Sequence, residues 1–377
     1  MNIYRVLAII RKEFIHILRD YRSLGMAIAM PILLIFLFGS SLSLDVDRVP
    51  LVVWDQNRTD DSREFIGRFT ASRYFSLNAA VGSYAEIEEM IDKREATLAL
   101  VIPSDFSRKL QSGHEVNVQL IVDGSDANTA TIAAGYAQAV TNGYTNSILI
   151  QAAQKRGAKT ISIPLDGKVR VWFNQNMQAK NYIIPGLIAV IMMVIASLLT
   201  SLTIAREWEN GTMEQLITTP LKPIELIIGK LTPYFLIGML DVLLAVLMGK
   251  YLFEVPLRGN AALVFGMTAL FLPGALAMGM LISIVTRSQL LASQLAMVLT
   301  FLPSFLLSGF MYAIANMPQP IQAITYLVPS RYFVAILKSI YLKGATLEII
   351  LTEALFLLVF GVVLILVANK KLKKRLV

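Results

Sequence analysis

The residues best suited to a binding site lie between two long apolar runs, where three carboxylates are close together. The stretch reads Arg206-Glu207-Trp208-Glu209-Asn210-Gly211-Thr212-Met213-Glu214-Gln215. Thr212 and Gln215, three positions later, match a capping box, which predicts a short helix beginning near Met213. Thr218-Thr219-Pro220 is predicted to end this helix. A stiff, acidic helix of this kind suits contact with a partner of complementary charge.

Little else in the chain suggests a catalytic or metal site. The 377 residues include no cysteine, so disulfides, thiol catalysis and cysteine-based metal sites are excluded. The two histidines, His16 and His114, are too few for a histidine-rich metal site. Asp123-Gly124-Ser125-Asp126 lacks the spaced ligands of a calcium loop and is interpreted as a turn. No metal, cofactor or catalytic residue is therefore expected on this chain.

Composition indicates an integral membrane protein. Hydrophobic residues make up 55% of the chain and charged residues only 16%, and the mean hydropathy is +0.61. Soluble domains carry about 25% charged residues. The net charge of +8 does not indicate nucleic-acid binding, because the basic excess lies at the two ends of the chain, where it orients a membrane protein.

Six apolar runs are long enough to cross about 30 Å of hydrocarbon. They cover residues 24–44, 182–204, 224–248, 261–285, 290–312 and 348–368. Residues 1–23 are predicted to form an amphipathic helix at the membrane surface, with an apolar stripe of Ile3, Leu7, Ile10, Phe14, Ile17 and Tyr21. Prolines interrupt residues 317–343, so this segment is interpreted as a re-entrant hairpin.

Residues 45–178 are predicted to form a water-exposed domain. They hold 14 Lys/Arg and 16 Asp/Glu, half of the 60 charges in the chain. Strands are predicted at 50–54, 74–81, 97–102 and 116–122, with a last alternation at Val169, Val171 and Phe173. Helices are predicted at 61–71, 84–94, 104–111, with Ser104 as N-cap, and 128–156. The predicted fold class is an α-helical polytopic membrane protein with six transmembrane helices and an α/β extracytoplasmic domain between the first two.

The distribution of basic residues predicts which side of the membrane each segment faces. With both termini inside, the inner segments carry 13 Lys/Arg and the short outer loops carry 5. This asymmetry places both termini and residues 206–220 in the cytoplasm, and residues 45–178 outside. An acidic inner loop does not serve orientation, which favours a binding role for it.

The acidic stretch resembles a motif of the permease subunits of ABC-2-type ABC transporters. The family pattern is Arg-Glu, an aromatic or basic residue, another Glu, and then Gly-Thr-Met/Leu-Glu-Gln-Leu. Here it appears as Arg206-Glu207-Trp208-Glu209-Asn210-Gly211-Thr212-Met213-Glu214-Gln215-Leu216. The surface helix, the outer domain and the hairpin also resemble this family, in particular its bacterial multidrug-type exporters. Residues 45–178 match more loosely than the transmembrane domain, residues 179–377.

The resemblance implies that residues 206–220 form a coupling helix that rests on an ATPase subunit. The sequence contains no Gly-x-x-x-x-Gly-Lys-Ser/Thr P-loop, so ATP and Mg²⁺ are expected on that separate partner. The implied coupling residues are Arg206, Glu207, Trp208, Glu209, Gly211, Thr212, Glu214 and Gln215. Two ATPase copies, a second permease subunit and membrane lipid are expected partners in the bacterial inner membrane, and a periplasmic adaptor is a further candidate.

The resemblance also implies outward transport of a hydrophobic or amphipathic substrate, drug-like or lipid-like. The path is placed mainly on the second and fifth spans, with ordinary helix packing as the alternative for each residue. The candidates are Tyr182, Met192, Met193, Ser197, Gln294, Met297, Phe301 and Ser304. Asp241, within the third span, is predicted to lie near its outer end, where hydration or a hydrogen bond between helices satisfies it, with substrate or proton chemistry as the alternative.

A different class of function is left open by the residues. The chain is alternatively a membrane-anchored receptor or assembly protein whose outer domain binds an extracytoplasmic partner, for example through the helix at 128–156. An intramembrane enzyme has little support, because Asp241 is its single buried acid. A separate ATPase that binds the acidic stretch would favour the exporter.

Overall fold

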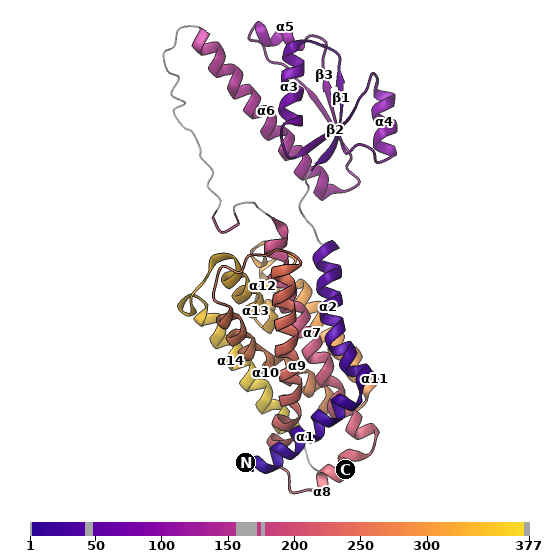
Figure 1. Cartoon of the computed structure of the whole chain (residues 1–377), viewed down its shortest axis with the longest axis vertical. Coiled ribbons are helices and arrows are strands. Elements are labelled where there is room, and N and C mark those ends of the chain that lie inside the picture. The colour runs from indigo at the N-terminus through magenta and orange to yellow at the C-terminus, as the bar shows by residue number, and fades with distance from the viewer. Residues whose placement is uncertain (1, 42–47, 156–171, 175–177, 373–377) are drawn as a thin grey trace. The chain divides into compact units, whose positions relative to one another are not determined.

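The computed structural model describes residues 2–41, 48–155, 172–174 and 178–372, and the chain divides into two compact units (Figure 1). One unit comprises Met1–Ser43 and Arg170–Val377, and the other comprises Leu44–Val169. Each unit has its own hydrophobic core. The membrane-like apolar runs and the highly charged middle of the chain are thus separated into different units.

The smaller unit is an α/β domain built on a four-stranded sheet. Its strands are β1 (Val49–Asp55), β2 (Phe75–Ala80), β3 (Leu98–Ile102) and β4 (Gln119–Val122), in the order β2-β1-β3-β4. β1 is parallel to β2 and β3, whereas β4 is antiparallel to β3. Its helices are α3 (Asp60–Thr70), α4 (Tyr84–Asp92), α5 (Phe106–Gln111) and α6 (Ala127–Lys155).

Alternating residues of β1 bury its two faces in separate cores, as the period of a strand requires. Leu51 packs in one core with Phe65 of α3 and Tyr144 of α6, and Val52 packs in the other with Ile87 of α4. The strands therefore lie between helices on both faces. The N-cap of α5 is Asp105, so the prediction of Ser104 is wrong. The predicted strand near residue 171 falls largely outside the described residues.

The larger unit is helical. It begins with α1 (Ile3–Arg19) and α2 (Tyr21–Ser41). After the smaller unit it continues with α7 (Ala179–Glu209), α8 (Thr212–Thr218), α9 (Pro223–Tyr251), α10 (Ala261–Thr286), α11 (Gln289–Leu306), η1 (Ile314–Asn316), α12 (Gln319–Thr325), α13 (Pro329–Lys338), η2 (Ser339–Lys343) and α14 (Leu347–Lys371). Five helices of the described residues are long and apolar enough to cross a membrane: α7, α9, α10, α11 and α14. The apolar part of α2, Ala27–Ser40, is shorter.

α7 is the central helix of this unit, and most of its apolar length is buried against α2, α9, α10, α11 and α13. Hydroxyl groups bind it to α10. The Ser197 hydroxyl donates to the Ala275 carbonyl at 3.0 Å, and the Thr200 hydroxyl donates to the Leu276 carbonyl at 2.8 Å. Gly279 permits this approach, because small residues let apolar helices pack closely.

Two helix ends differ most from the predicted spans. α7 continues through the first charged residues of the acidic stretch to Glu209, because nothing disfavours a helix before Asn210 and Gly211. α11 ends at Leu306, earlier than the predicted residue 312, and the chain turns at Gly309, which has a φ of 78°. The predicted hairpin region contains the short helices α12 and α13 followed by the π-helical η2.

Replacing Gly279 by alanine is expected to destabilise the helical unit. The added Cβ would lie 2.0 Å from the Ser197 carbonyl oxygen, and a backbone atom cannot move aside cheaply. We expect a loss of about 1–3 kcal/mol of unfolding free energy, measured as a lower melting temperature in detergent. Gly266→Ala is the matched control, because no atom lies within 4 Å of its added Cβ. Equal melting temperatures for the two variants would contradict the described packing of α7 on α10.

Candidate coupling site

α8 lies at the same end of the helical unit as α1 (Figure 1). It follows α7 after only Asn210 and Gly211, and Gly211 has a φ of 70°, a conformation that glycine adopts readily. Met213 is fully buried in the core of the unit and anchors α8 to it. The N-cap of α8 is Gly211, and the Thr212 hydroxyl donates instead to the Glu207 carboxylate. The predicted capping box of Thr212 is therefore wrong, because a nearby buried acceptor takes its hydroxyl.

Glu207 is the centre of a buried charge network rather than an exposed contact. Only 8% of Glu207 is exposed. Its Oε1 accepts from Lys12 Nζ of α1 at 2.8 Å and from Lys230 Nζ of α9 at 2.9 Å. Lys230 also donates to Glu13 of α1 at 2.6 Å, and both of these residues are buried. Two carboxylates and two ammonium groups thus join α1, α7 and α9 with no net charge.

Further contacts fasten α1 to the segment between α8 and α9. The buried carboxylate of Glu225 accepts from the backbone N–H of Asn2 at 2.7 Å and from that of Lys222 at 3.0 Å. The Arg5 guanidinium donates to the Pro220 carbonyl. The chain on both sides of α8 is therefore held by α1.

The remaining charged residues at the end of α7 hold the beginning of α11. The Glu209 carboxylate accepts from the backbone N–H of Gln289 at 2.8 Å, where a negative charge stabilises the first turn of a helix. Arg206 donates to the Gln289 side chain at 3.3 Å and lies 3.7 Å from Asp20. The Arg287 guanidinium lies 4.5 Å from the centre of the Trp208 ring. These contacts are internal to the chain.

Only part of the predicted coupling set is free to contact a partner. Glu214 and Gln215 are exposed on α8, and within the described residues Glu214 forms no ion pair. The structure brings Glu207, Thr212, Glu209 and Arg206 into contacts with this chain's own helices. Of the three carboxylates, Glu207 is buried, Glu209 is exposed but bound to Gln289, and Glu214 is exposed on α8.

Sequence reasoning missed Lys12, Glu13, Lys230 and Glu225. The buried face of α1 consists of Val6, Ile9, Glu13 and Ile17, whereas Ile3 and Leu7 of the predicted stripe are mostly exposed. Glu13 is at helical spacing with these apolar residues, and Lys230 interrupts an apolar run. Each of these two residues lies on the apolar face of its helix. This pattern was the sequence signal that could have predicted a buried ion pair.

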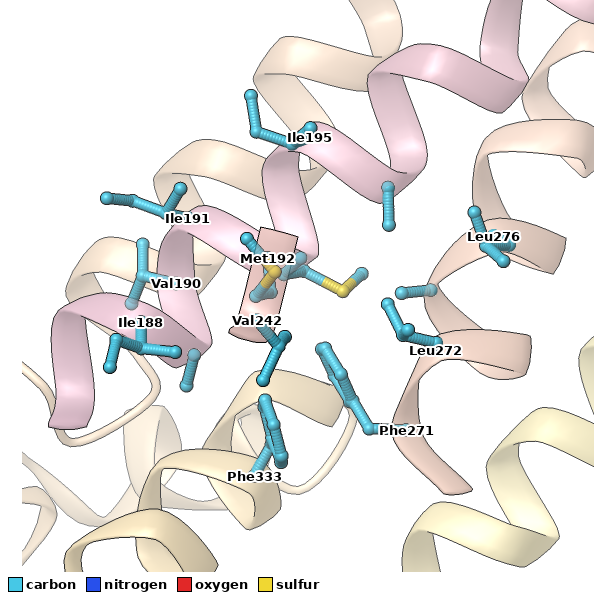
Figure 2. Close-up of a cluster of buried hydrophobic side chains, with 14 of the residues drawn as sticks. Ile188, Val190, Ile191, Met192, Ile195, Val242, Phe271, Leu272, Leu276 and Phe333 are labelled. Carbon is cyan, nitrogen blue, oxygen red and sulfur yellow. The ribbon is translucent and has the colours of Figure 1, made fainter. Parts of the chain in front are cut away.

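The predicted pathway residues of α7 do not line an open surface. Met192, Met193 and Ser197 are buried inside the unit. Figure 2 shows Met192 among apolar side chains of neighbouring helices, including Val242 of α9 and Phe271 of α10. Tyr182 is placed separately, and its hydroxyl donates to the Gly309 carbonyl at 3.1 Å.

The predicted pathway residues of α11 are placed differently from those of α7. Gln294 is exposed and Met297 is 57% exposed, whereas Phe301 is partly buried against Phe305 and Ser304 is buried. The structure of a single chain therefore does not bring the two predicted groups together on one surface.

Asp241 differs from its prediction. It is only 1% exposed, and neither carboxylate oxygen has a hydrogen-bond partner among the described residues. Within the described residues, Asp241 therefore lacks the hydrogen bond to a neighbouring helix that was predicted as one way to satisfy it.

Replacing Lys230 by methionine is expected to destabilise the chain strongly. Glu13 would lose the ammonium that compensates its burial, and breaking a buried pair costs about 3–5 kcal/mol. Thermal unfolding in detergent measures the loss. Adding Glu13→Gln should recover part of it, because Glu207 keeps Lys12. Lys250→Met, at an exposed position of the same helix, is the control. No difference between the two lysine variants would contradict the network.

Comparisons with known proteins agree with the motif. Residues 22–369 match the family described as ABC-2 family transporter protein. The chain is 37% identical over 376 residues to the probable multidrug ABC transporter permease YbhS of Escherichia coli strain K12, an alignment that covers 99% of this chain and 97% of that protein.

Two further relatives come from the same strain. The identity is 31% to the probable multidrug ABC transporter permease YbhR, over 92% of each chain. It is 27% to the inner membrane transport permease YhhJ, over 95% of this chain and 96% of that one. With the family match extending over most of its length, the chain belongs to the ABC-2 family of transporter proteins.

Proposed function

We propose that the chain is a permease subunit of an ATP-driven ABC-2 exporter and that α8 is its coupling helix. One observation carries the assignment of α8. Its inner side is fixed to the helical unit through Met213 and the Glu207 network, while Glu214 and Gln215 face outward. A helix that is held firmly on one side and exposed on the other can receive a force from a partner and pass it on.

The buried network supports rigid transmission of such a force. Separating Glu207 from Lys230 would remove one ion pair from the buried network, which is costly. A displacement of α8 is therefore expected to move α7, α9 and α1 together rather than to bend the link between them. Glu209 extends the same connection to α11 through its contact with Gln289.

The proposed energy source is a separate ATPase subunit that carries the ATP and Mg²⁺. We expect two ATPase copies and two permease subunits per complex, as the resemblance of the motif to ABC-2 permeases implies. The exposed apolar residues of α11 support a second permease subunit as its neighbour, among them Leu295, Met297, Val298 and Leu302. A transport path between two subunits would use this face of α11 rather than the buried methionines of α7.

The proposed topology counts α2 as a sixth span, with both termini cytoplasmic and the α/β domain outside. On α1, exposed apolar residues such as Leu7 and Leu18 lie beside the exposed Arg11 and Arg19. This combination suits a helix on the surface of an anionic membrane. The α/β domain is the proposed site for any extracytoplasmic adaptor.

The proposed substrate is a hydrophobic or amphipathic molecule that moves outward across the inner membrane. The relatives YbhS and YbhR are named as probable multidrug permeases, which supports a drug-like or lipid-like compound.

Reversing the charge of Glu214 tests the coupling assignment. Glu214→Lys is expected to lower co-purification of the ATPase subunit at least about tenfold, because a reversed charge at an interface costs a few kcal/mol. The chain itself should keep its melting temperature, since Glu214 is exposed. Glu207 is unsuitable for this test because its replacement disturbs the internal network.

Glu88→Lys, at an exposed position of α4, is the matched control and should leave ATPase binding unchanged. The readout is ATPase recovered with the tagged permease, together with ATP hydrolysis by the reconstituted complex. Full ATPase binding and hydrolysis by the Glu214 variant would refute α8 as the coupling helix.

A further inference from the structure

A cavity of about 430 Å³ lies among α7, α13, α14 and the turn that follows α11. It is far from α8, because Tyr182 in its lining and Glu209 are separated by about 40 Å along α7. A volume of this size is in the range of small-molecule sites. The cavity is distinct from the coupling site, and Tyr182 is its one lining residue among the predicted pathway residues.

Two cations line the cavity, and neither forms an ion pair with a carboxylate of the described residues. Lys338 Nζ donates to the Gly309 carbonyl at 2.8 Å and lies 3.3 Å from the centre of the Tyr182 ring. The Arg331 guanidinium donates to the Thr325 hydroxyl and lies 3.8 Å from the centre of the Tyr326 ring. Each cation is thus positioned by a ring and a hydrogen bond, without a counter-ion among the described residues.

Both cations retain donors for a ligand. An ammonium carries three N–H donors and a guanidinium five, and the described contacts use only one of each. Lys338 and Arg331 are also partly buried, so their charges are incompletely hydrated. A bound anionic group would offset that cost and accept charge-assisted hydrogen bonds.

The walls of the cavity suit an apolar body attached to that anion. The rings of Tyr332 and Phe356 are stacked with centres 4.9 Å apart, and Tyr182 and Tyr326 add further aromatic surface. Glu353 also lines the cavity, and its Oε2 is buried without a hydrogen-bond partner among the described residues. This oxygen can accept from a hydroxyl or amine of a ligand headgroup.

Two glycines determine where the Lys338 side chain lies. A Cβ on Gly186 would lie 3.2 Å from Lys338 Cε and 2.6 Å from the Phe310 ring, so glycine leaves room for the lysine stem. Gly309 has a φ of 78°, and its carbonyl accepts from both Tyr182 and Lys338. Contacts within the chain therefore position Tyr182 and Lys338 without a bound ligand.

We propose that this cavity binds the anionic headgroup of an amphipathic molecule, with Lys338 and Arg331 as its recognition residues. The anion would be a phosphate, sulfate or carboxylate, and the aromatic walls would contact the adjoining apolar part. Either a membrane phospholipid or a single-chain transported amphiphile supplies this chemistry. The proposal concerns binding and does not depend on the assignment of α8.

The test uses the purified full chain, with any subunits that co-purify, in a neutral detergent. Native mass spectrometry follows titration with dioctanoyl phosphatidylglycerol, dodecyl phosphate, dioctanoylglycerol or inorganic phosphate. Lys338→Gln and Arg331→Gln should each weaken binding of the anionic amphiphiles about tenfold, the value of one hydrogen bond to a charged group. Lys338→Arg keeps the charge and should retain most of the binding, which separates loss of the site from misfolding.

Lys343→Gln is the matched control, because Lys343 is exposed nearby and does not line the cavity. It should bind as the unmodified chain does. Preference for phosphatidylglycerol over dodecyl phosphate would identify a lipid site, and the reverse preference a site for single-chain amphiphiles. Equal losses for Lys343→Gln and Lys338→Gln, or equal binding of dioctanoylglycerol, would overturn the proposal. Equal binding of inorganic phosphate would overturn the requirement for an apolar body.

Discussion

The ammonium of Lys230, almost completely removed from solvent between Glu13 and Glu207, is the interaction on which the helical unit depends. A buried charge is tolerated only while its partners remain in place. These partners come from α1 and α7, whereas Lys230 belongs to α9. One charged group therefore constrains three helices, of which α1 is distant in sequence from α7 and α9. Lys12 completes the network from the exposed side and balances its charge.

This constraint gives three neighbouring glutamates three different roles. Glu207 faces inward on α7 and belongs to the network, and Glu209, two residues later, stabilises the start of α11. Glu214 lies beyond the turn at Gly211 and is exposed. Helix register and the turn decide these roles, since the residue type is the same. The carboxylates were predicted to form one docking surface, but the fold leaves most of them facing the chain's own helices.

The physical origin of each feature explains how much was predictable from the sequence. Long apolar runs indicate helices that can cross a membrane, and alternating β-branched residues indicate strands. The five membrane-length helices and the four described strands therefore lie close to their predicted positions. The motif around Glu207 indicated the family, because its residue order is specific. The partners of Glu207 depend on which face of α1 packs against α9, and α1 has apolar residues on more than one face. Tertiary packing determines which face of α1 is buried, and it also determines that Asp241 is buried.

α7 connects two ends of the helical unit that handle charge in opposite ways. At the α8 end, every charge of the Lys230 network has a partner within the chain. Near Tyr182, the Lys338 ammonium contacts a ring and a carbonyl and forms no ion pair with a described residue, which suits the anion that we propose it binds. If motion of the proposed coupling helix α8 displaces α7 relative to α13, Tyr182 moves relative to Lys338, and the affinity of the cavity for an anion is expected to differ between the two positions. Linkage then requires the reverse effect. An anion bound near Tyr182 would shift the equilibrium between the two positions of α8 by the same coupling free energy. The central helix α7 would thus provide a physical route by which the proposed ligand binding and the proposed ATPase docking influence each other.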